Sequence, residues 1–252
     1  MRVAVIGGTG SVGRAVAAEL ARRGDEVRVL SRRAPAALPA GASHHAVDLR
    51  DGSGLAAALE GVEAVVDAAN SRRRAKEVLV AGTERVLAAG RAAGVGHYVG
   101  ISIIGIDRVP MSYYKLKLRQ EQAIAAGPLP WSVLRAAQFH SLLDGMLTAA
   151  ARLRLRLTGS ALVQPVDEAI VAARLADAVH ADPAGMLPEV AGPEVLSASE
   201  LSRAWQRANP RALLPLPLPL LGRAGRALRE GALTNPDAAA GGPTFAEWLA
   251  RR

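Results

Sequence analysis

The chain has 252 residues and a formal net charge of +8, since 31 lysines and arginines oppose 23 aspartates and glutamates. Half of the residues are hydrophobic, which excludes a disordered chain and is enough for one large α/β domain or a core with a modest second lobe. Cysteine is absent, so disulfides, thiolate zinc sites and thiol catalysis are excluded.

The ends and the apolar runs of the sequence bear on its location. The opening residues MRVAVIGGTG leave no room for a secretion signal, which predicts a cytoplasmic protein. The longest charge-free stretch, 92–106, contains four glycines and is too short to span a membrane. We therefore expect no membrane partner.

Short apolar runs alternate with longer stretches of helical period, the pattern of a doubly wound parallel sheet with helices on both faces. The predicted strands are 2–6, 26–30, 43–47, 64–68, 97–102 and 131–134. The predicted helices are 11–23, 54–60, 76–93, 112–126, 168–181 and 244–252.

The strand–helix rhythm fades after about residue 140, where proline becomes common. We expect a nucleotide-binding core at 1–140 that also includes about 161–181, and a substrate lobe formed mainly by 141–252. Three prolines bar a helix at 213–221, so this Leu-Pro run is expected to be an extended loop that is packed or faces a partner.

A glycine-rich turn links the first predicted strand to the first predicted helix. Glycine allows unusual backbone angles, close approach to a phosphate and close packing of helix on strand. The helix N-terminus adds free N–H groups and a partial positive charge. A glycine-rich surface turn is the alternative, but the placement favours a dinucleotide site made of Gly7, Gly8, Thr9, Gly10, Ser11, Val12 and Gly13.

The residues after the second predicted strand indicate which dinucleotide binds. An acidic residue here would hold the adenosine ribose 2′-hydroxyl, but the sequence has Ser31, Arg32 and Arg33. Guanidinium groups pair well with phosphate oxygens, so NADP(H) is favoured over NAD(H). The missing acid is the stronger argument, because arginine is the default basic residue of this chain.

Two further strand ends are expected beside the cofactor. Asp48 and Leu49 follow the third predicted strand, where such folds usually cover the adenine ring. Ala68, Ala69 and Asn70 end the fourth strand.

Tyr113 and Lys117 are four residues apart on a predicted helix and so share one face. A nearby ammonium lowers the pKa of a phenol, and Lys117 can also bind the nicotinamide ribose. Ser102, which ends the fifth predicted strand, can donate to a substrate oxygen. Two of only three tyrosines and two of only three lysines lie in 113–117. This clustering favours catalysis over the alternative, an ordinary amphipathic helix.

The segments GGTGSVGR, SRR, YVGISIIGIDRVPMSYYKLK and LPWSVLRAAQFH resemble the atypical short-chain dehydrogenase/reductases, in particular their NmrA-like branch. The segments QPVD, AGPE and TFAEWL extend the resemblance over nearly the whole chain. It implies a Rossmann core that binds NAD(P), a small C-terminal substrate lobe, and a triad of Ser102, Tyr113 and Lys117.

The family implies two functions. Some members reduce quinones, imines or activated double bonds, whereas many NmrA-like members lack the tyrosine and sense redox state with a protein partner. Because Tyr113 and Lys117 are present, we expect an NADPH-dependent reductase of a small, largely apolar carbonyl, quinone, imine or enone. The redox sensor is the alternative.

The excess of basic residues raises the question of a nucleic-acid partner. Arginine clusters at 72–74 and 152–156 are expected to be solvated surface, or for 72–74 the rim of the cofactor cleft, because no nucleic-acid motif accompanies them. Five scattered histidines predict no metal site. The substrate pocket is expected from 138–160 and 183–235, with Gln138, Phe139 and His140 as candidates, in a monomer or homodimer.

Overall fold

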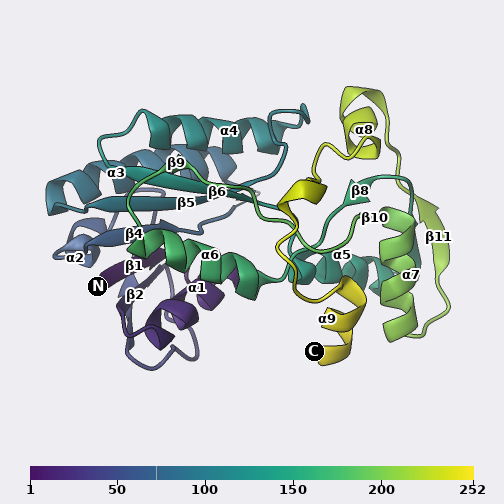
Figure 1. Ribbon diagram of the computed structural model, residues 1–252, viewed down its shortest axis with the longest axis horizontal. Coiled ribbons are helices and arrows are strands. Elements are labelled where there is room, and N and C mark those ends of the chain that lie inside the picture. The colour runs from purple at the N-terminus through teal and green to yellow at the C-terminus, as the bar shows by residue number, and fades with distance from the viewer. Residues whose placement is uncertain (72) are drawn as a thin grey trace. The chain divides into compact units, whose positions relative to one another are not determined.

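A computed structural model describes residues 1–71 and 73–252 (Figure 1). They form two compact units. Unit 1 comprises 1–102, 115–134 and 171–187, and unit 2 comprises 103–114, 135–170 and 188–252. Unit 2 contains 103–114, 135–140 and 161–170, which the sequence places in the core, and unit 1 contains 182–187, which it places in the lobe.

Unit 1 is built on a seven-stranded sheet with the order β3-β2-β1-β4-β5-β6-β9. The strands are β1 Arg2–Ile6, β2 Glu26–Ser31, β3 Ala42–Ala46, β4 Ala64–Asp67, β5 His97–Ile103, β6 Trp131–Ala136 and β9 Gly185–Met186. The pairs β1–β2, β1–β4, β2–β3, β4–β5 and β6–β9 are parallel. This confirms the predicted doubly wound sheet. Because the order changes direction between β1 and β4, a ligand crevice is expected at their carboxyl ends.

Helices cover both faces of this sheet, with α3 and α4 on one side and α1 and α6 on the other (Figure 1). The helices are α1 Ser11–Arg22, α2 Leu55–Leu59, α3 Gly82–Ala93, α4 Ser112–Ala125 and α6 Glu168–His180. A π-helical stretch, Lys76–Ala81, leads directly into α3. The predicted helix 76–93 is therefore present, with a wider first part.

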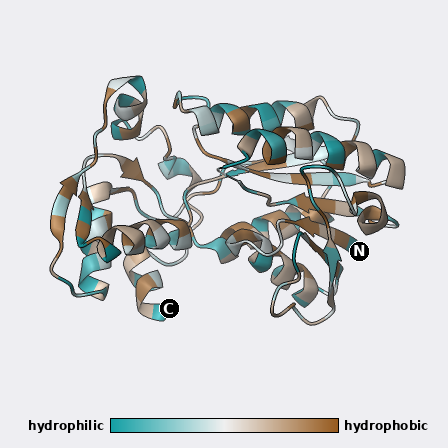
Figure 2. Ribbon diagram, turned by 180° about the vertical axis from the view of Figure 1, so that it is seen from behind, coloured by the Kyte–Doolittle hydropathy of each residue, from teal (hydrophilic) through white to brown (hydrophobic). Residues whose placement is uncertain are grey.

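The central strands β1 and β4 are largely apolar on both faces because both faces are covered. Ala4 and Ile6 of β1 pack in one cluster with Val86 and Leu87 of α3. Val3 and Val5 alternate with them and are also buried, on the opposite face. Brown stretches in Figure 2 mark apolar parts of the sheet.

Unit 2 has a core formed by three helices, α5 His140–Arg152, α7 Ala198–Ala208 and α9 Phe245–Arg251. Its remaining elements are β7 Leu155–Thr158, β8 Leu162–Val163, β10 Leu196–Ser197, β11 Leu214–Pro217, α8 Gly222–Arg229 and the 3-10 turn Pro236–Ala238. The Trp205 indole donates to Asp144 Oδ1 at 2.7 Å and so ties α7 to α5. Only α9 of these helices is expected from the sequence. α7 nevertheless begins with a capping box, in which Ser197 and Glu200 bond to each other's backbone amide, and the prediction did not use this start signal.

The Leu-Pro run forms a strand rather than the expected loop. β11 runs parallel to β7, and the amides of Leu214 and Leu218 donate to Arg154 O and Thr158 O, each at 2.8 Å. Proline lacks an amide hydrogen, but Pro215 and Pro217 alternate with the donating leucines. The alternation lets a proline-rich segment pair along one edge.

His140 also departs from its expected place. It is 0% exposed, and its ring stacks on Phe245 and Trp248 at centroid distances of 5.7 and 5.5 Å. Its two ring nitrogens have no hydrogen-bond partner of good geometry in the described part of the chain. His140 is therefore a core residue of unit 2 and not part of an open pocket wall or surface.

We predict that His140→Phe weakens the acid sensitivity of folding. Burial lowers the pKa of His140, while the Asp167 charge and the Pro243 backbone oppose this shift. Below pH 6.5, the ordinary pKa of histidine, the unfolded chain therefore binds more protons at residue 140 than the folded chain does. His140 thus lowers the free energy of unfolding as the pH falls below this value. Urea denaturation at about pH 7.5 and about pH 5 should show that the free energy of unfolding falls less between these pH values in the variant than in the native protein. Equal losses in the two proteins would contradict the assignment.

Candidate functional site

The glycine turn after β1 is closed by backbone contacts that exclude side chains. Gly7 has a φ of +70°, and a Cβ there would lie 2.8 Å from the backbone of Ala68 and Ala69. A Cβ on Gly13 would lie 2.2 Å from Gly7 O. The turn can therefore form only with glycine at these positions.

The first turn of α1 is open to an anion. The N-cap residue is Gly10, which has no capping side chain, and no acidic residue lies in the first turn. Backbone N–H groups at a helix start lack partners within the helix and carry partial positive charge. Together with the glycine turn, they fit the pyrophosphate of a dinucleotide.

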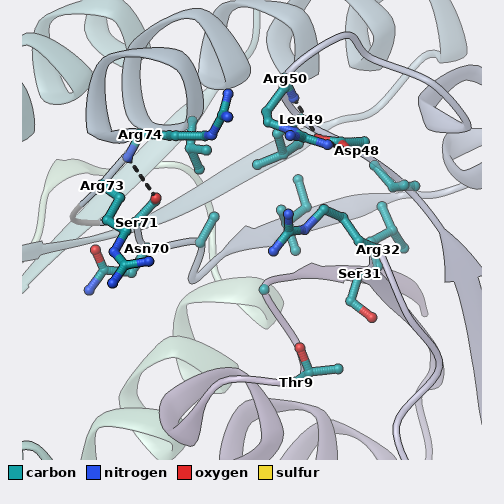
Figure 3. A pocket seen from close by; sticks show the side chains of 16 residues that line it. Thr9, Ser31, Arg32, Asp48, Leu49, Arg50, Asn70, Ser71, Arg73 and Arg74 are labelled. Carbon is teal, nitrogen blue, oxygen red and sulfur yellow. Dashed lines mark hydrogen bonds and ion pairs between the residues drawn. The ribbon is translucent and has the colours of Figure 1, made fainter.

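A cavity of about 470 Å³ lies beside this turn (Figure 3). Residues predicted from the sequence line it at the ends of several strands, namely Gly7, Thr9, Ser31, Arg32, Asp48, Leu49, Ala69 and Asn70. The cavity thus brings together side chains from β1, β2, β4 and the loop after β3, as the strand order requires.

Other predicted residues lie around the cavity. Gly8, Gly10, Ser11, Val12 and Gly13 form the turn and the start of α1, and Ala68 lies against Gly7. Arg33 is exposed and does not line the cavity. Its carbonyl accepts a hydrogen bond of 2.8 Å from the Ser31 hydroxyl, which closes the local turn.

Four arginines line the cavity. Arg73 and Arg74 agree with the expected cleft rim, whereas Arg72 lies outside the described residues. Sequence reasoning did not identify Arg50 or Ser71 as part of this site. The signal for Arg50 was its position two residues after Asp48, within reach of that carboxylate.

Two of the four guanidinium groups are occupied by carboxylates. Arg50 Nε lies 3.0 Å from Asp48 Oδ1 and its Nη2 lies 2.5 Å from Oδ2, which lowers the pKa of Asp48 to about 2. Arg74 pairs with Glu77 at 3.0 Å. Among the residues that the structure describes, Arg32 and Arg73 have no ion-pair partner. They come from opposite sides of the cavity (Figure 3).

Lys117 is fixed to the strand that carries Ser102. It is 4% exposed, and its Nζ donates to Ile101 O at 2.8 Å and to Gln120 Oε1 at 2.6 Å. Burial lowers its pKa to about 8, although the charges of Asp67 and Glu121 oppose this shift. The ammonium group is thus held at the residue that precedes Ser102.

Ser102 and Tyr113 are the other two residues of the predicted triad, and they belong to unit 1 and unit 2, respectively. Ser102 is 3% exposed, and its hydroxyl has no hydrogen-bond partner in the described ranges. Tyr113 is half-buried on α4, the continuous helix that also carries Lys117. Its ring lies 5.8 Å from that of Tyr114, measured between centroids.

Residues 1–71 and 73–252 contain no group of three or more metal-ligating side chains placed to hold an ion.

No helix within these ranges combines the length and apolarity needed to cross a membrane.

Comparison with known proteins agrees with this geometry. Residues 7–181 match the model of a family described as NAD(P)H-binding. The chain is 32% identical to a (4-alkanoyl-5-oxo-2,5-dihydrofuran-3-yl)methyl phosphate reductase of Streptomyces griseus, over 84% of this chain and 75% of the relative. It is 34% identical to a dTDP-6-deoxy-L-talose 4-dehydrogenase of Kitasatospora kifunensis, over 58% of this chain and 57% of that relative.

A solved structure shares the fold over the full length. It is an NADPH-dependent quinone oxidoreductase of Escherichia coli in complex with NADPH, with a TM-score of 0.80, 18% identity, and coverage of 100% of this chain and 99% of the other. The fold, the glycine turn and the family match agree with the resemblance noted in the sequence. The chain belongs to the NAD(P)H-binding family and is an NAD(P)-dependent oxidoreductase.

Proposed function

We propose that this protein is an NADPH-dependent reductase of a small, largely apolar carbonyl, quinone, imine or enone, with Tyr113 as proton donor. One observation carries the proposal. The buried Lys117 ammonium is bonded to the carbonyl oxygen of Ile101, and the next residue, Ser102, has a buried hydroxyl with no partner among the described residues. An unpaired buried hydroxyl costs free energy, which a substrate oxygen that accepts its hydrogen bond would recover.

The cofactor is assigned to the glycine turn and the cavity. The amides at the start of α1 would hold the pyrophosphate, and Arg32 and Arg73 would bind the 2′-phosphate from two sides. Asp48 does not oppose this phosphate, because its charge is compensated by Arg50. When bound, NADPH supplies the hydride for the substrate carbon.

The residues of the chain then deliver the proton. Ser102 donates a hydrogen bond to the substrate oxygen and polarises the carbonyl. For a carbonyl substrate, Tyr113 would give its phenolic proton to that oxygen. The charge of Lys117 stabilises the phenolate left on Tyr113.

The names of similar proteins support reduction as the direction of the reaction. The Streptomyces griseus relative is named as a reductase, and the Escherichia coli structure is of a quinone oxidoreductase. The apolar character of the proposed substrate remains a prediction from the sequence, which expects the pocket wall in 138–160 and 183–235.

We predict that Tyr113→Phe reduces NADPH turnover by about 100-fold or more, because the variant lacks the phenolic proton. Oxidation of NADPH would be followed by its absorbance against a panel of carbonyl, quinone, imine and enone acceptors. NADPH affinity, measured by titration calorimetry, should stay nearly unchanged.

Tyr114→Phe is the matched control, since it removes the same atom from the neighbouring residue of α4. It should retain most of the turnover. Unchanged turnover in Tyr113→Phe would refute the assigned proton donor. Absence of turnover with every acceptor, together with partner binding that differs between NADP⁺ and NADPH, would indicate the redox sensor instead.

A separate prediction concerns cofactor choice. Arg32→Ala and Arg73→Ala should each weaken NADPH binding by about tenfold to a hundredfold, since each removes charge-assisted hydrogen bonds to a phosphate. NADH binding should change little. Arg33→Ala, which alters a residue outside the cavity, should have a smaller effect. Equal losses for NADH and NADPH would contradict a 2′-phosphate site.

A further inference from the structure

A buried carboxylate lies behind Lys117. Asp67, at the end of β4, is 3% exposed. Its Oδ1 accepts from the Ala69 amide at 2.9 Å. Its Oδ2 accepts from Tyr98 Oη at 2.5 Å, Gln120 Nε2 at 3.2 Å and Thr83 Oγ1 at 3.4 Å. Both oxygens act only as acceptors, the pattern of an ionised carboxylate.

Gln120 connects this carboxylate to the ammonium group. Its Nε2 donates to Asp67 Oδ2 and to Thr83 Oγ1, at 3.2 and 3.0 Å, while its Oε1 accepts from Lys117 Nζ at 2.6 Å. An ionised carboxylate can only accept and an ammonium can only donate. The two charges therefore permit one orientation of the Gln120 amide, with its oxygen toward Lys117.

We propose that Asp67 is a positioning residue for Lys117, acting through Gln120 to hold the ammonium group in place and to keep it protonated. The consequence for catalysis rests on the function proposed above. Asp67 and Gln120 do not line the cofactor cavity, and they come from β4 and α4. Their role is thus to act on Lys117 rather than on the reacting atoms.

The electrostatics of the site explain why such support is needed. Burial of an ammonium group favours its neutral form, and burial is the largest cause of the lowered pKa of Lys117. Asp67 and Glu121 are the two carboxylates that oppose this effect. Asp67 is joined to Lys117 by a chain of hydrogen bonds through Gln120.

Tyr98 serves the same arrangement without taking part in proton transfer. Burial, reinforced by the charge of Asp67 and the hydrogen bond to it, raises the pKa of Tyr98 well above 10. The phenol therefore keeps its proton and remains a donor to Asp67. Tyr98 is the one tyrosine outside 113–117, and its place in the core explains its presence.

The test uses the small number of lysines. The chain has three, Lys76, Lys115 and Lys117, so protein labelled with ¹³C at lysine Cε gives three resonances. Lys76→Arg and Lys115→Arg assign them. In the native protein the Lys117 resonance should titrate well below the ordinary lysine value. In Asp67→Asn its midpoint should fall by about one unit or more, because the opposing carboxylate is lost.

A double variant separates this role from a merely structural one. Asp67→Asn combined with Gln120→Glu exchanges the positions of amide and carboxylate, so that residue 120 accepts from both Lys117 and the new amide. The Lys117 midpoint should return to the native value or above it. Gln120→Met alone removes the link and should lower the midpoint, which keeps the test valid where Asp67→Asn fails to fold.

Asp25→Asn is the matched control. Asp25 is another buried aspartate of unit 1, bound at Oδ1 by His180 Nε2 at 3.1 Å and not linked to Lys117. Its loss should leave the Lys117 midpoint unchanged. An unchanged midpoint in Asp67→Asn, or no recovery in the double variant, would overturn the proposal.

Activity gives a second readout. If turnover requires protonated Lys117, it declines as the pH rises through the pKa of this lysine, and in Asp67→Asn the decline should begin at lower pH. The outcomes separate the two proposals. A shifted Lys117 titration without NADPH turnover by any acceptor contradicts the proposed function alone. Normal turnover with an unshifted titration contradicts the role of Asp67 alone.

Discussion

The close approach of backbone to backbone at the glycine turn is the constraint on which the site depends. Gly13 packs on Gly7 O, and Gly7 lies against Ala68 and Ala69 at the end of β4. No side chain fits between them, so α1 starts directly over the switch between β1 and β4. The open helix start, the cavity and the end of β4 are thereby brought to one place. Asp67 is the last residue of β4 and directly precedes Ala68. One strand therefore supports both the cofactor site and the buried network.

Charge is distributed unevenly between the cavity and the core. In the cavity, arginines exceed acidic groups, and the surplus left after the Asp48–Arg50 and Arg74–Glu77 pairs suits a phosphate. In the core, one ammonium and one carboxylate are joined through an amide. Low polarity makes that pair interact strongly, but it also makes an unpaired member costly. The network therefore fixes Lys117 more firmly than a surface lysine could be fixed.

The nucleotide-binding core was largely predictable, because its signals are local. Strand-length apolar runs, the glycine turn and the Tyr113–Lys117 spacing each depend on a few neighbouring residues. Unit 2 was predictable only in part. Its helices α5 and α7 acquire a core by packing on α9, and β11 becomes a strand because β7 lies beside it. Such partners are distant in the chain, so the apolar stripes of α5 and α7 do not by themselves indicate which elements they pack against.

The sequence by itself determined the fold class, the glycine turn, the absence of an acid after β2 and the candidates Ser102, Tyr113 and Lys117. Only the tertiary structure decided which charged groups are free and which are bound. It placed Arg32 and Arg73 in the cavity without ion-pair partners in the described ranges, and left Arg33 outside it. It also buried Asp67, Tyr98 and Gln120 around Lys117. The reason is physical: pairing and burial depend on distances between residues far apart in the chain, which spacing along the sequence does not contain.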